Sequence, residues 1–161
     1  MALILGIDQS YTSSGLVITD DDSGAMVYFE RFKTDPTHDT YARALAVAQQ
    51  VCGVVATYNP MIMNLEGLAF GIRGNATRDL AGLLFTIVNI VLSKYPDLKY
   101  NILPPTAVKK RATGSGKAKK KEMIDALPSG VKQAFTDKNF KLTTGLADLA
   151  DAYWISVCAD K

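Results

Sequence analysis

Two aspartates, Asp148 and Asp151, interrupt the stretch GLADLADAYW, in which almost every other residue is apolar. A helix that is apolar nearly all round is a buried helix. A carboxylate in such surroundings is costly unless a positive charge meets it. Because the aspartates are three residues apart, both project from one face of this helix. The stretch therefore predicts a buried acidic pair that needs a cation.

Two further acids end apolar segments that are typical of buried strands. Asp8 ends ALILGID, and Glu66 ends MIMNLE. Functional groups gather at the carboxyl ends of strands in α/β sheets, so the four acids are expected to converge. Four carboxylates at one partly buried place repel one another and need cations. We expect Mg²⁺, rather than a protein cation, to offset their burial.

Oxygen ligands without a nearby histidine suit Mg²⁺ or Mn²⁺ rather than zinc. The single histidine, His38, lies in the polar link DPTHDT and is expected to be a solvated loop residue. Two such ions about 3.5–4 Å apart can cleave a phosphodiester in line, since one lowers the pKa of the attacking water and the other stabilises the departing oxygen. The acids thus predict two ions per site.

Each acid taken singly has a structural alternative. Asp8 would cap the turn after its strand, and the first aspartate of the late helix would complement the helix dipole. Glu66 would pair with Arg73 or Arg78. None of these roles accounts for Asp151, one turn deeper in the apolar run, so the joint metal-binding interpretation is favoured.

One segment carries most of the positive charge. Seven of the 18 basic residues and none of the 16 acidic ones lie between positions 109 and 121. They are Lys109, Lys110, Arg111, Lys117, Lys119, Lys120 and Lys121. Concentrated positive charge indicates a polyanionic partner, and the glycines of TGSGK let backbone N–H groups approach a phosphate. The alternative is a solvated helix face.

The elements that must position these groups follow from hydrophobic periodicity. Three strands with short links, at Ala2–Asp8, Ser14–Thr19 and residues 25–32, predict an antiparallel meander. A helix follows, capped by Asp39 or Thr40 and ended by Asn59 and Pro60. The strand Met61–Glu66, a glycine-rich loop, a long helix over Leu80–Val91 and the strand Leu98–Pro104 come next.

The last third of the chain is expected to be mainly helical. A short helix begins at Thr106, and KKKEMIDAL forms another that is closed by Pro128. The polar stretch Ser129–Thr143 has no clear pattern, and Thr143 or Thr144 is expected to cap the final helix. The order predicts a mixed α/β layered domain, with residues 1–161 forming a single domain.

The totals limit the class of protein. The chain has 161 residues, of which 48% are hydrophobic, enough for one domain with a real core. No apolar run approaches the ~20 residues of a membrane span, and the start lacks the basic region of a signal peptide. Cys52 and Cys158 fall in apolar patterns, as small core residues of a reducing compartment do. The expected location is the cytoplasm, or the host cytoplasm for a viral chain.

Four segments together resemble the RuvC-type Holliday junction resolvases of the RNase H-like (retroviral integrase-like) superfamily. They are GIDQSYTSSGLVI, NLEGLAF, LPPTAVKKRATGSGKAKKKEM and ADLADAYWIS, in the family's order and spacing. The resemblance implies an RNase H-like fold with a mixed five-stranded sheet, three strands antiparallel and two parallel, flanked by helices. Relatives occur in cells, in bacteriophages and in other viruses.

The resemblance also implies roles for single residues. Asp8 matches the first-strand aspartate that touches both metals, and Glu66 matches the family glutamate. Asp148 and Asp151 match the helix pair, although some relatives have histidine at the first position. Gln9 replaces the usual proline.

The implied DNA contacts come from the basic segment and the glycine-rich loop. Phe70 is close in the sequence to the position of a family aromatic that inserts among bases. It lies four residues after Glu66, whereas the family aromatic is expected three residues after the glutamate. Lys109 and Lys120 match positions that contact the junction near the cut. The full expected DNA-binding set is Lys109, Lys110, Lys117, Lys119, Lys120, Lys121, Phe70 and Arg73.

The leading hypothesis is a metal-dependent endonuclease that nicks four-way junctions symmetrically, with forks and flaps as further substrates. The family works as a homodimer through the helix around Leu80–Val91. That helix is apolar over more than one face, so it either meets a partner subunit or is covered on both sides within one domain. The alternatives for the chain are an actin-like or sugar-kinase-like ATP-binding domain, whose first phosphate loop resembles GIDQSYTSSG, and a junction-binding protein that does not cut.

Overall fold

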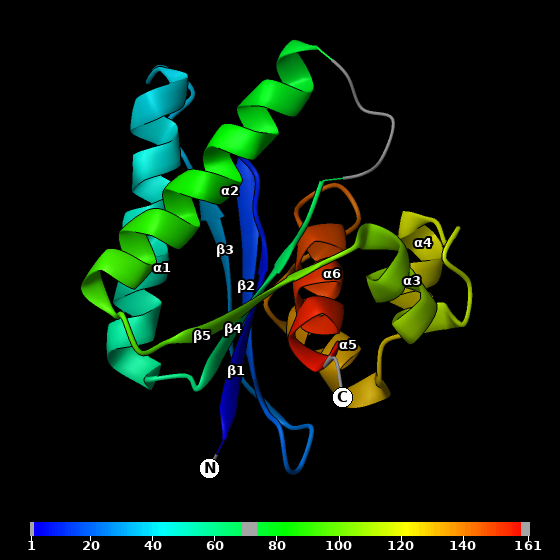
Figure 1. Cartoon of the computed structure of the whole chain (residues 1–161). Coiled ribbons are helices and arrows are strands. Elements are labelled where there is room, and N and C mark those ends of the chain that lie inside the picture. The colour runs from blue at the N-terminus through cyan, green and yellow to red at the C-terminus, as the bar shows by residue number, and fades with distance from the viewer. Residues whose placement is uncertain (1, 69–73, 159–161) are drawn as a thin grey trace.

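A five-stranded mixed sheet forms the centre of the computed structural model, which describes residues 2–68 and 74–158 (Figure 1). The strand order is β3-β2-β1-β4-β5. Strands β1, β2 and β3 pair antiparallel, whereas β4 is parallel to β1 and β5 is parallel to β4. The strands are β1 Leu3–Asp8, β2 Ser13–Asp20, β3 Met26–Lys33, β4 Ile62–Glu66 and β5 Lys99–Leu103. The predicted sheet is confirmed.

Helices cover both faces of this sheet and bury two separate cores (Figure 1). One face packs against α1 and α2, and the other against α6, beside which α3, α4 and α5 lie. Because side chains alternate along a strand, Val17 of β2 faces α6 while Leu16 and Ile18 face α1 and α2. The helices are α1 Thr40–Tyr58, α2 Asn75–Lys94, α3 Pro105–Thr113, α4 Lys120–Asp125, α5 Ser129–Asp137 and α6 Leu146–Val157.

Helix α6 lies directly on the sheet because two glycines make room for its backbone. A Cβ on Gly6 would lie 2.3 Å from the carbonyl oxygen of Ala152, and a Cβ on Gly15 would lie 2.4 Å from that of Asp148. Both distances are too short for any side chain. The amide of Asn64 adds a tether, since its Nδ2 donates to the carbonyl of Ile155 at 3.1 Å. The position of α6 over β1 and β2 is therefore fixed.

The helix ends confirm one predicted cap and correct another. Asp39 caps α1, since its Oδ1 accepts from the N–H of Ala42 at 2.8 Å. The expectation that Thr143 or Thr144 caps α6 is wrong. Helix α6 begins after Gly145, which has a φ of 109° and provides no side-chain cap. Only glycine adopts such a backbone readily, and the hydroxyl of Thr144 accepts from the N–H of Lys141 instead.

Helix α2 is longer and less covered than the sequence indicates. It begins at Asn75, and only its inner side, with Leu83, Ile87 and Val91, is fully buried. Phe85 is 65% exposed, so of the two alternatives left open for this helix, coverage on both sides within one domain is not observed. Within the described ranges α2 is the one helix long and apolar enough to cross a membrane, a test that core helices of soluble proteins also pass.

Candidate active site

The two strand-end acids lie side by side at one edge of the sheet. Strands β1 and β4 are parallel neighbours, and Ile7 pairs with Leu65. Asp8 and Glu66 are the next residues of these strands, so they leave the sheet together. On its other side, Asp8 pairs with Gly15 of β2. The backbone of Asp148 packs against this glycine. The predicted convergence of these acids is thus built into the strand register.

Burial raises the pKa values of three of the acids, and repulsion between carboxylates raises two of these pKa values further. The pKa of Asp8 is raised well above its ordinary value, first by burial and then by the charges of Asp151, Glu66 and Asp148. The pKa of Asp151 rises to about 7, from burial and from repulsion by Glu66 and Asp148. Burial also raises the pKa of Glu66. The four carboxylates therefore share one electrostatic site, which favours a bound cation.

Two lysines of the basic segment act on this site. The charge of Lys120 opposes the raised pKa values of Asp8 and Asp151. Lys109 has the same effect on Glu66 and Asp151. Lys109 lies on α3 and Lys120 begins α4, and both helices pack beside α6. The structure thus brings these two predicted DNA-binding residues to the acids.

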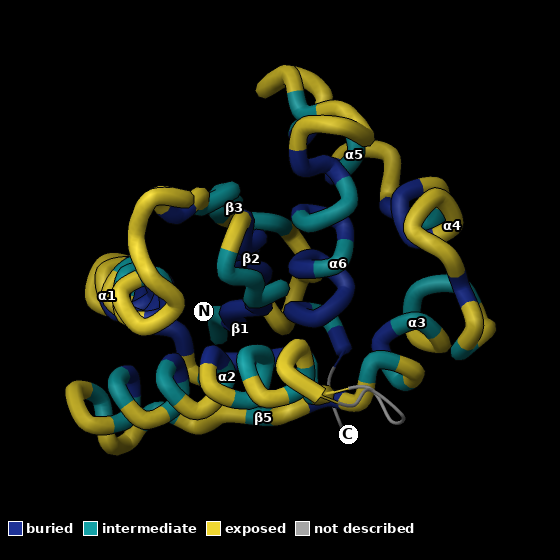
Figure 2. Tube along the Cα trace, turned by 90° about the horizontal axis from the view of Figure 1, so that it is seen from above, coloured by how far each residue is buried: buried dark blue, intermediate teal, exposed yellow. Residues whose placement is uncertain are grey.

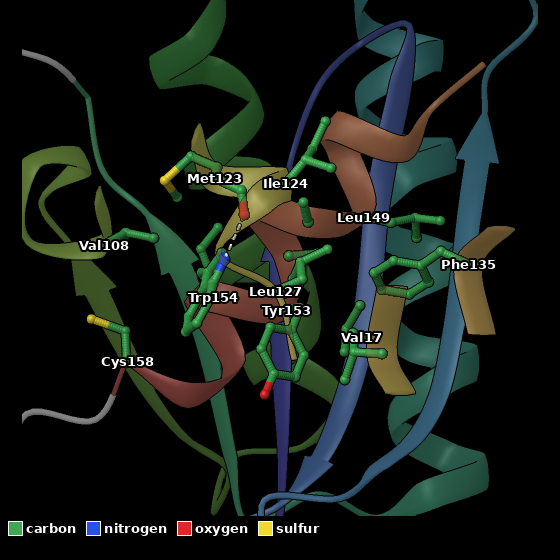
Figure 3. Close-up of a cluster of buried hydrophobic side chains, with 14 of the residues drawn as sticks. Val17, Val108, Met123, Ile124, Leu127, Phe135, Leu149, Tyr153, Trp154 and Cys158 are labelled. Carbon is green, nitrogen blue, oxygen red and sulfur yellow. Dashed lines mark hydrogen bonds between the residues drawn. The ribbon is translucent and has the colours of Figure 1, made fainter. Parts of the chain in front are cut away.

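The hydrophobic core beside α6 fixes the lysine-bearing helices. Trp154 of α6 donates from its indole Nε1 to the carbonyl of Met123 at 3.0 Å (Figure 3). Met123 is buried three residues after Lys120, so this bond ties α4 to the helix that carries the aspartates. Sequence reasoning gave Trp154 no such role, because its partner is a backbone atom of another helix.

The remaining expected DNA contacts divide into two groups. Four lysines are exposed and form no ion pair with an acid in the described ranges. They are Lys110, Lys117, Lys119 and Lys121. Phe70 and Arg73 fall in residues 69–73 and lie outside the described residues. The four exposed lysines therefore form a basic surface that is open to solvent on the side of the molecule that carries α3 and α4.

Asp148 differs from the other acids because protein groups hold it. The hydroxyl of Ser13 donates to Asp148 Oδ2 at 3.0 Å. Arg31 Nε lies 3.8 Å from the same oxygen and donates to Ser13 Oγ at 2.7 Å. The expectation that Mg²⁺ alone offsets the acids is therefore wrong for Asp148, since Arg31 reaches it from β3.

Two of the structural alternatives, a turn cap by Asp8 and a Glu66–Arg78 ion pair, are not observed among the described residues, and Arg73 lies outside them. A turn cap would require the Asp8 carboxylate to accept a hydrogen bond. Within residues 2–68 and 74–158, no such bond is found. Arg78 forms its ion pair with the adjacent Asp79, whose Oδ1 lies 3.4 Å from Arg78 Nε, and not with Glu66. Gln9 joins the two strand ends, since its Nε2 donates to the carbonyl of Glu66 at 2.6 Å. Its Oε1 is buried and has no partner in the described part of the chain.

The donor set fits a hard divalent cation, although it does not form a closed cage. Carboxylate oxygens are the ligands that Mg²⁺ and Mn²⁺ prefer. His38 lies in an exposed loop 3.6 Å from Asp35, as expected for a solvated residue. In the described segments, no three His, Cys, Asp or Glu side chains are set to hold one ion. Binding of an ion would therefore require these side chains to adjust.

Comparison with known proteins identifies relatives over nearly the whole chain. The family model described as crossover junction endodeoxyribonuclease RuvC matches residues 4–159. A protein of that name from Clavibacter michiganensis subsp. michiganensis is 27% identical over 168 residues, covering 97% of this chain and 74% of the relative. A second, from Clavibacter sepedonicus, is 26% identical over the same shares.

Solved structures share the fold at lower sequence identity. T. thermophilus RuvC in complex with a Holliday junction substrate has a TM-score of 0.74 and 22% identity, over 98% of this chain and 92% of the other. Fowlpox virus resolvase in complex with substrate Holliday junction DNA has a TM-score of 0.55 and 17% identity, over 96% and 94%. At these identities the likeness concerns the fold.

Proposed function

Because the chain belongs to the crossover junction endodeoxyribonuclease RuvC family, we propose that it resolves Holliday junctions by nicking DNA strands at the acidic site. One observation carries the proposal: four acids share one electrostatic site beside Lys109 and Lys120. A phosphodiester next to these lysines would face the carboxylates. The proposed substrates are four-way junctions, with forks and flaps as further branched DNA.

We propose that Asp8, Glu66, Asp148 and Asp151 hold two Mg²⁺ ions, for which Mn²⁺ substitutes. Bound there, the ions would lower the pKa of an attacking water and stabilise the departing oxygen. The protein's own part is positional: β1 and β4 present Asp8 and Glu66 at one edge, and α6 adds the two aspartates from above the sheet. Lys109 and Lys120 would hold the phosphate backbone at this edge.

Family membership disfavours the two alternatives. The matched family model covers residues 4–159, the same residues that the actin-like or sugar-kinase-like interpretation would assign to an ATP-binding lobe. A junction-binding protein that does not cut would have no use for four acids that repel one another. The cost of assembling them, visible in the raised pKa values of Asp8 and Asp151, supports catalysis.

A panel of labelled substrates tests the function. Four-way junctions, forks, flaps and linear duplexes are incubated with the protein and Mg²⁺ or Mn²⁺. We expect paired nicks at symmetric positions in the four-way junction and no cutting without metal. If no branched DNA is cut with either metal, the proposal fails. Tight ATP binding without DNA binding would favour the ATP-binding alternative.

Substitution of the two lysines tests the DNA contacts. In the variant Lys109→Gln with Lys120→Gln, junction binding should weaken and become less dependent on salt. The slope of log affinity against log salt falls by about 0.9 for every phosphate that the protein no longer binds. Lys94→Gln is the matched control, because Lys94 ends α2 on the opposite face of the sheet. Binding measured by fluorescence anisotropy at several salt concentrations gives the slopes, and equal slopes for both variants would contradict the assignment.

We propose that two copies of the chain associate through α2 and the adjoining edge strand β5. Figure 2 shows that much of α2 is only partly covered. Phe85 projects from it, and Tyr100 and Ile102 of β5 are also exposed. Ile102 lies on the α2 side of β5, because side chains alternate and Leu103 faces the other core. A second copy would cover this apolar surface and supply the second active site that symmetric nicking requires.

Phe85→Glu is expected to convert the dimer to monomers. A buried interface aromatic contributes on the order of 2 kcal/mol, or roughly 30-fold in the dimer dissociation constant. Sedimentation equilibrium measures that constant. Val27→Glu is the matched control, since Val27 is 44% exposed on β3, the edge strand opposite β5. If Phe85→Glu dimerises like the wild type, or the wild type is monomeric, the interface is wrong.

A further inference from the structure

Asp8, Gly15 and Arg31 lie in one row across three strands. Asp8 pairs with Gly15 of β2, and Gly15 pairs with Arg31 of β3. Paired residues project from the same face of a sheet, here the face that α6 covers. Since Gly15 has no side chain, the backbone of Asp148 occupies the space between its two neighbours. Asp148 thus lies between an acid on one strand and a cation on another.

Arg31 reaches into the N-terminal end of α6. A Cβ on Gly145 would lie 2.4 Å from Arg31 Cδ and 2.5 Å from Arg31 Nε, so the guanidinium stem rests against the glycine that begins the helix. The positive end of the helix dipole disfavours a cation there. Only 21% of the Arg31 side chain is exposed. A partially buried arginine in this place needs specific partners, and Ser13 and Asp148 are those partners.

The hydrogen bonds run in one direction, from Arg31 to Ser13 to Asp148. Arg31 Nε donates to Ser13 Oγ at 2.7 Å, and the same hydroxyl donates its single proton to Asp148 Oδ2 at 3.0 Å. The contact of Arg31 with Asp148, at 3.8 Å, also falls on Oδ2. Among the described residues no hydrogen bond is found for Oδ1, and the Asp148 side chain is 32% exposed. One oxygen is therefore held and the other is left available.

We propose that Arg31 and Ser13 are positioning residues that hold Asp148 by Oδ2 and so present Oδ1 to a divalent cation at the acidic site. The inference rests on the metal site of the proposed function. Such partners of a ligating carboxylate fix its rotamer before the ion arrives, and their loss typically costs 10–100-fold in metal affinity or activity. Arg31 and Ser13 bear on metal binding without contacting DNA or the ion.

The test compares metal binding by variants of this 161-residue chain in the absence of DNA. Arg31→Gln removes the charge, and Ser13→Ala removes only the hydroxyl. Arg43→Gln is the matched control, because Arg43 Nε also donates to a hydroxyl, Thr34 Oγ1, at 2.8 Å, but on α1. Calorimetric titration and the Mg²⁺-induced shift in melting temperature both give the half-saturating Mg²⁺ concentration.

We expect Arg31→Gln and Ser13→Ala to raise the half-saturating Mg²⁺ concentration by about 10-fold or more. Arg43→Gln and Ser13→Thr, which retains the hydroxyl, should stay close to the wild type. In junction cleavage, the Mg²⁺ dependence should shift in the same two variants while the rate at saturating Mg²⁺ changes much less. A loss of stability alone would not separate Ser13→Ala from Ser13→Thr in this way.

An unchanged half-saturating concentration in both Arg31→Gln and Ser13→Ala would overturn the inference. A lower one would also overturn it, because Arg31 and Ser13 would then compete with the ion for Asp148. If Arg31→Gln does not fold, Ser13→Ala decides. A wild type that shows no response to Mg²⁺ would overturn the metal site itself. A wild type that responds, with unaltered variants, would overturn only the role of Arg31 and Ser13.

Discussion

Asp8→Asn is expected to abolish junction cleavage while leaving junction binding nearly intact. Asp8 lies beside Glu66 in the strand register, and the charges of the other three acids add to the effect of burial in raising its pKa. An amide in its place removes a ligand shared by the proposed ions. Because such ions contribute several kcal/mol to the transition state, the cleavage rate should fall roughly a thousandfold or more. DNA binding should persist, since it depends on the lysines.

The experiment measures single-turnover cleavage and junction affinity for the same preparations. Asp97→Asn is the matched control, because Asp97 is an exposed aspartate in the turn between α2 and β5. This variant should cleave like the wild type. The melting temperature of metal-free Asp8→Asn should not fall, because the substitution removes a buried charge that its neighbours repel. Normal cleavage by Asp8→Asn would show that the site assignment is wrong.

The acids could be found in the sequence because each is an anomaly along a single element. Asp8 and Glu66 end apolar strands, and Asp151 lies inside an apolar helix. These patterns depend only on residues close in the chain, and the sheet that positions them follows from the same periodicity. The resemblance of four ordered motifs then supplied the topology. These predictions needed no knowledge of which residues meet across strands.

Arg31 and Ser13 could not be found in this way, because their role depends on strand register. The pairing of Gly15 with Arg31 brings the arginine to the acids, and a shift of one residue would turn its side chain to the opposite face. Gly15 within an apolar strand was a weak signal, since glycine in a strand often marks a close backbone approach. It does not identify the segment that approaches.

Helix α5 and the start of α6 escaped prediction for a related reason. Helix α5 has only two buried residues, Val131 and Phe135, within a polar stretch. They meet the core beside α6 only after the chain has folded back, and packing of this kind rather than propensity stabilises short helices. Gly145 begins α6 in a left-handed backbone, and Arg31 fills the space that a side chain at this position would need.

Asp151→Asn is expected to stabilise the metal-free protein and to remove most of its response to Mg²⁺. Asp151 has a pKa of about 7, against an ordinary value of 3.8, because burial and the charges of Glu66 and Asp148 disfavour its ionised form. The folded chain therefore binds this proton more tightly than the unfolded chain does. Stability must then decline as the pH rises from about 4 to about 7.

The amide variant has no such proton to lose, so its stability should depend less on pH over that range. Above pH 7 it should exceed the wild type by on the order of 4 kcal/mol in the free energy of unfolding, or roughly 8–16 °C in melting temperature for a chain of this size. Below pH 4 the two proteins should differ little. Thermal unfolding in chelator at several pH values measures both trends.

Added Mg²⁺ should reverse the order of the two proteins. An ion that binds only the folded state stabilises it in proportion to the logarithm of its concentration over its dissociation constant. The wild type, whose carboxylates repel one another until an ion arrives, gains this stabilisation. Asp151→Asn has relieved the repulsion in advance and has one ligand fewer, so it gains little. An equal Mg²⁺ response in both proteins, or a metal-free variant that melts below the wild type at pH 7.5, would contradict a metal role for Asp151. The opposed effects arise because the charge that costs stability in the metal-free fold is the charge that binds the ion.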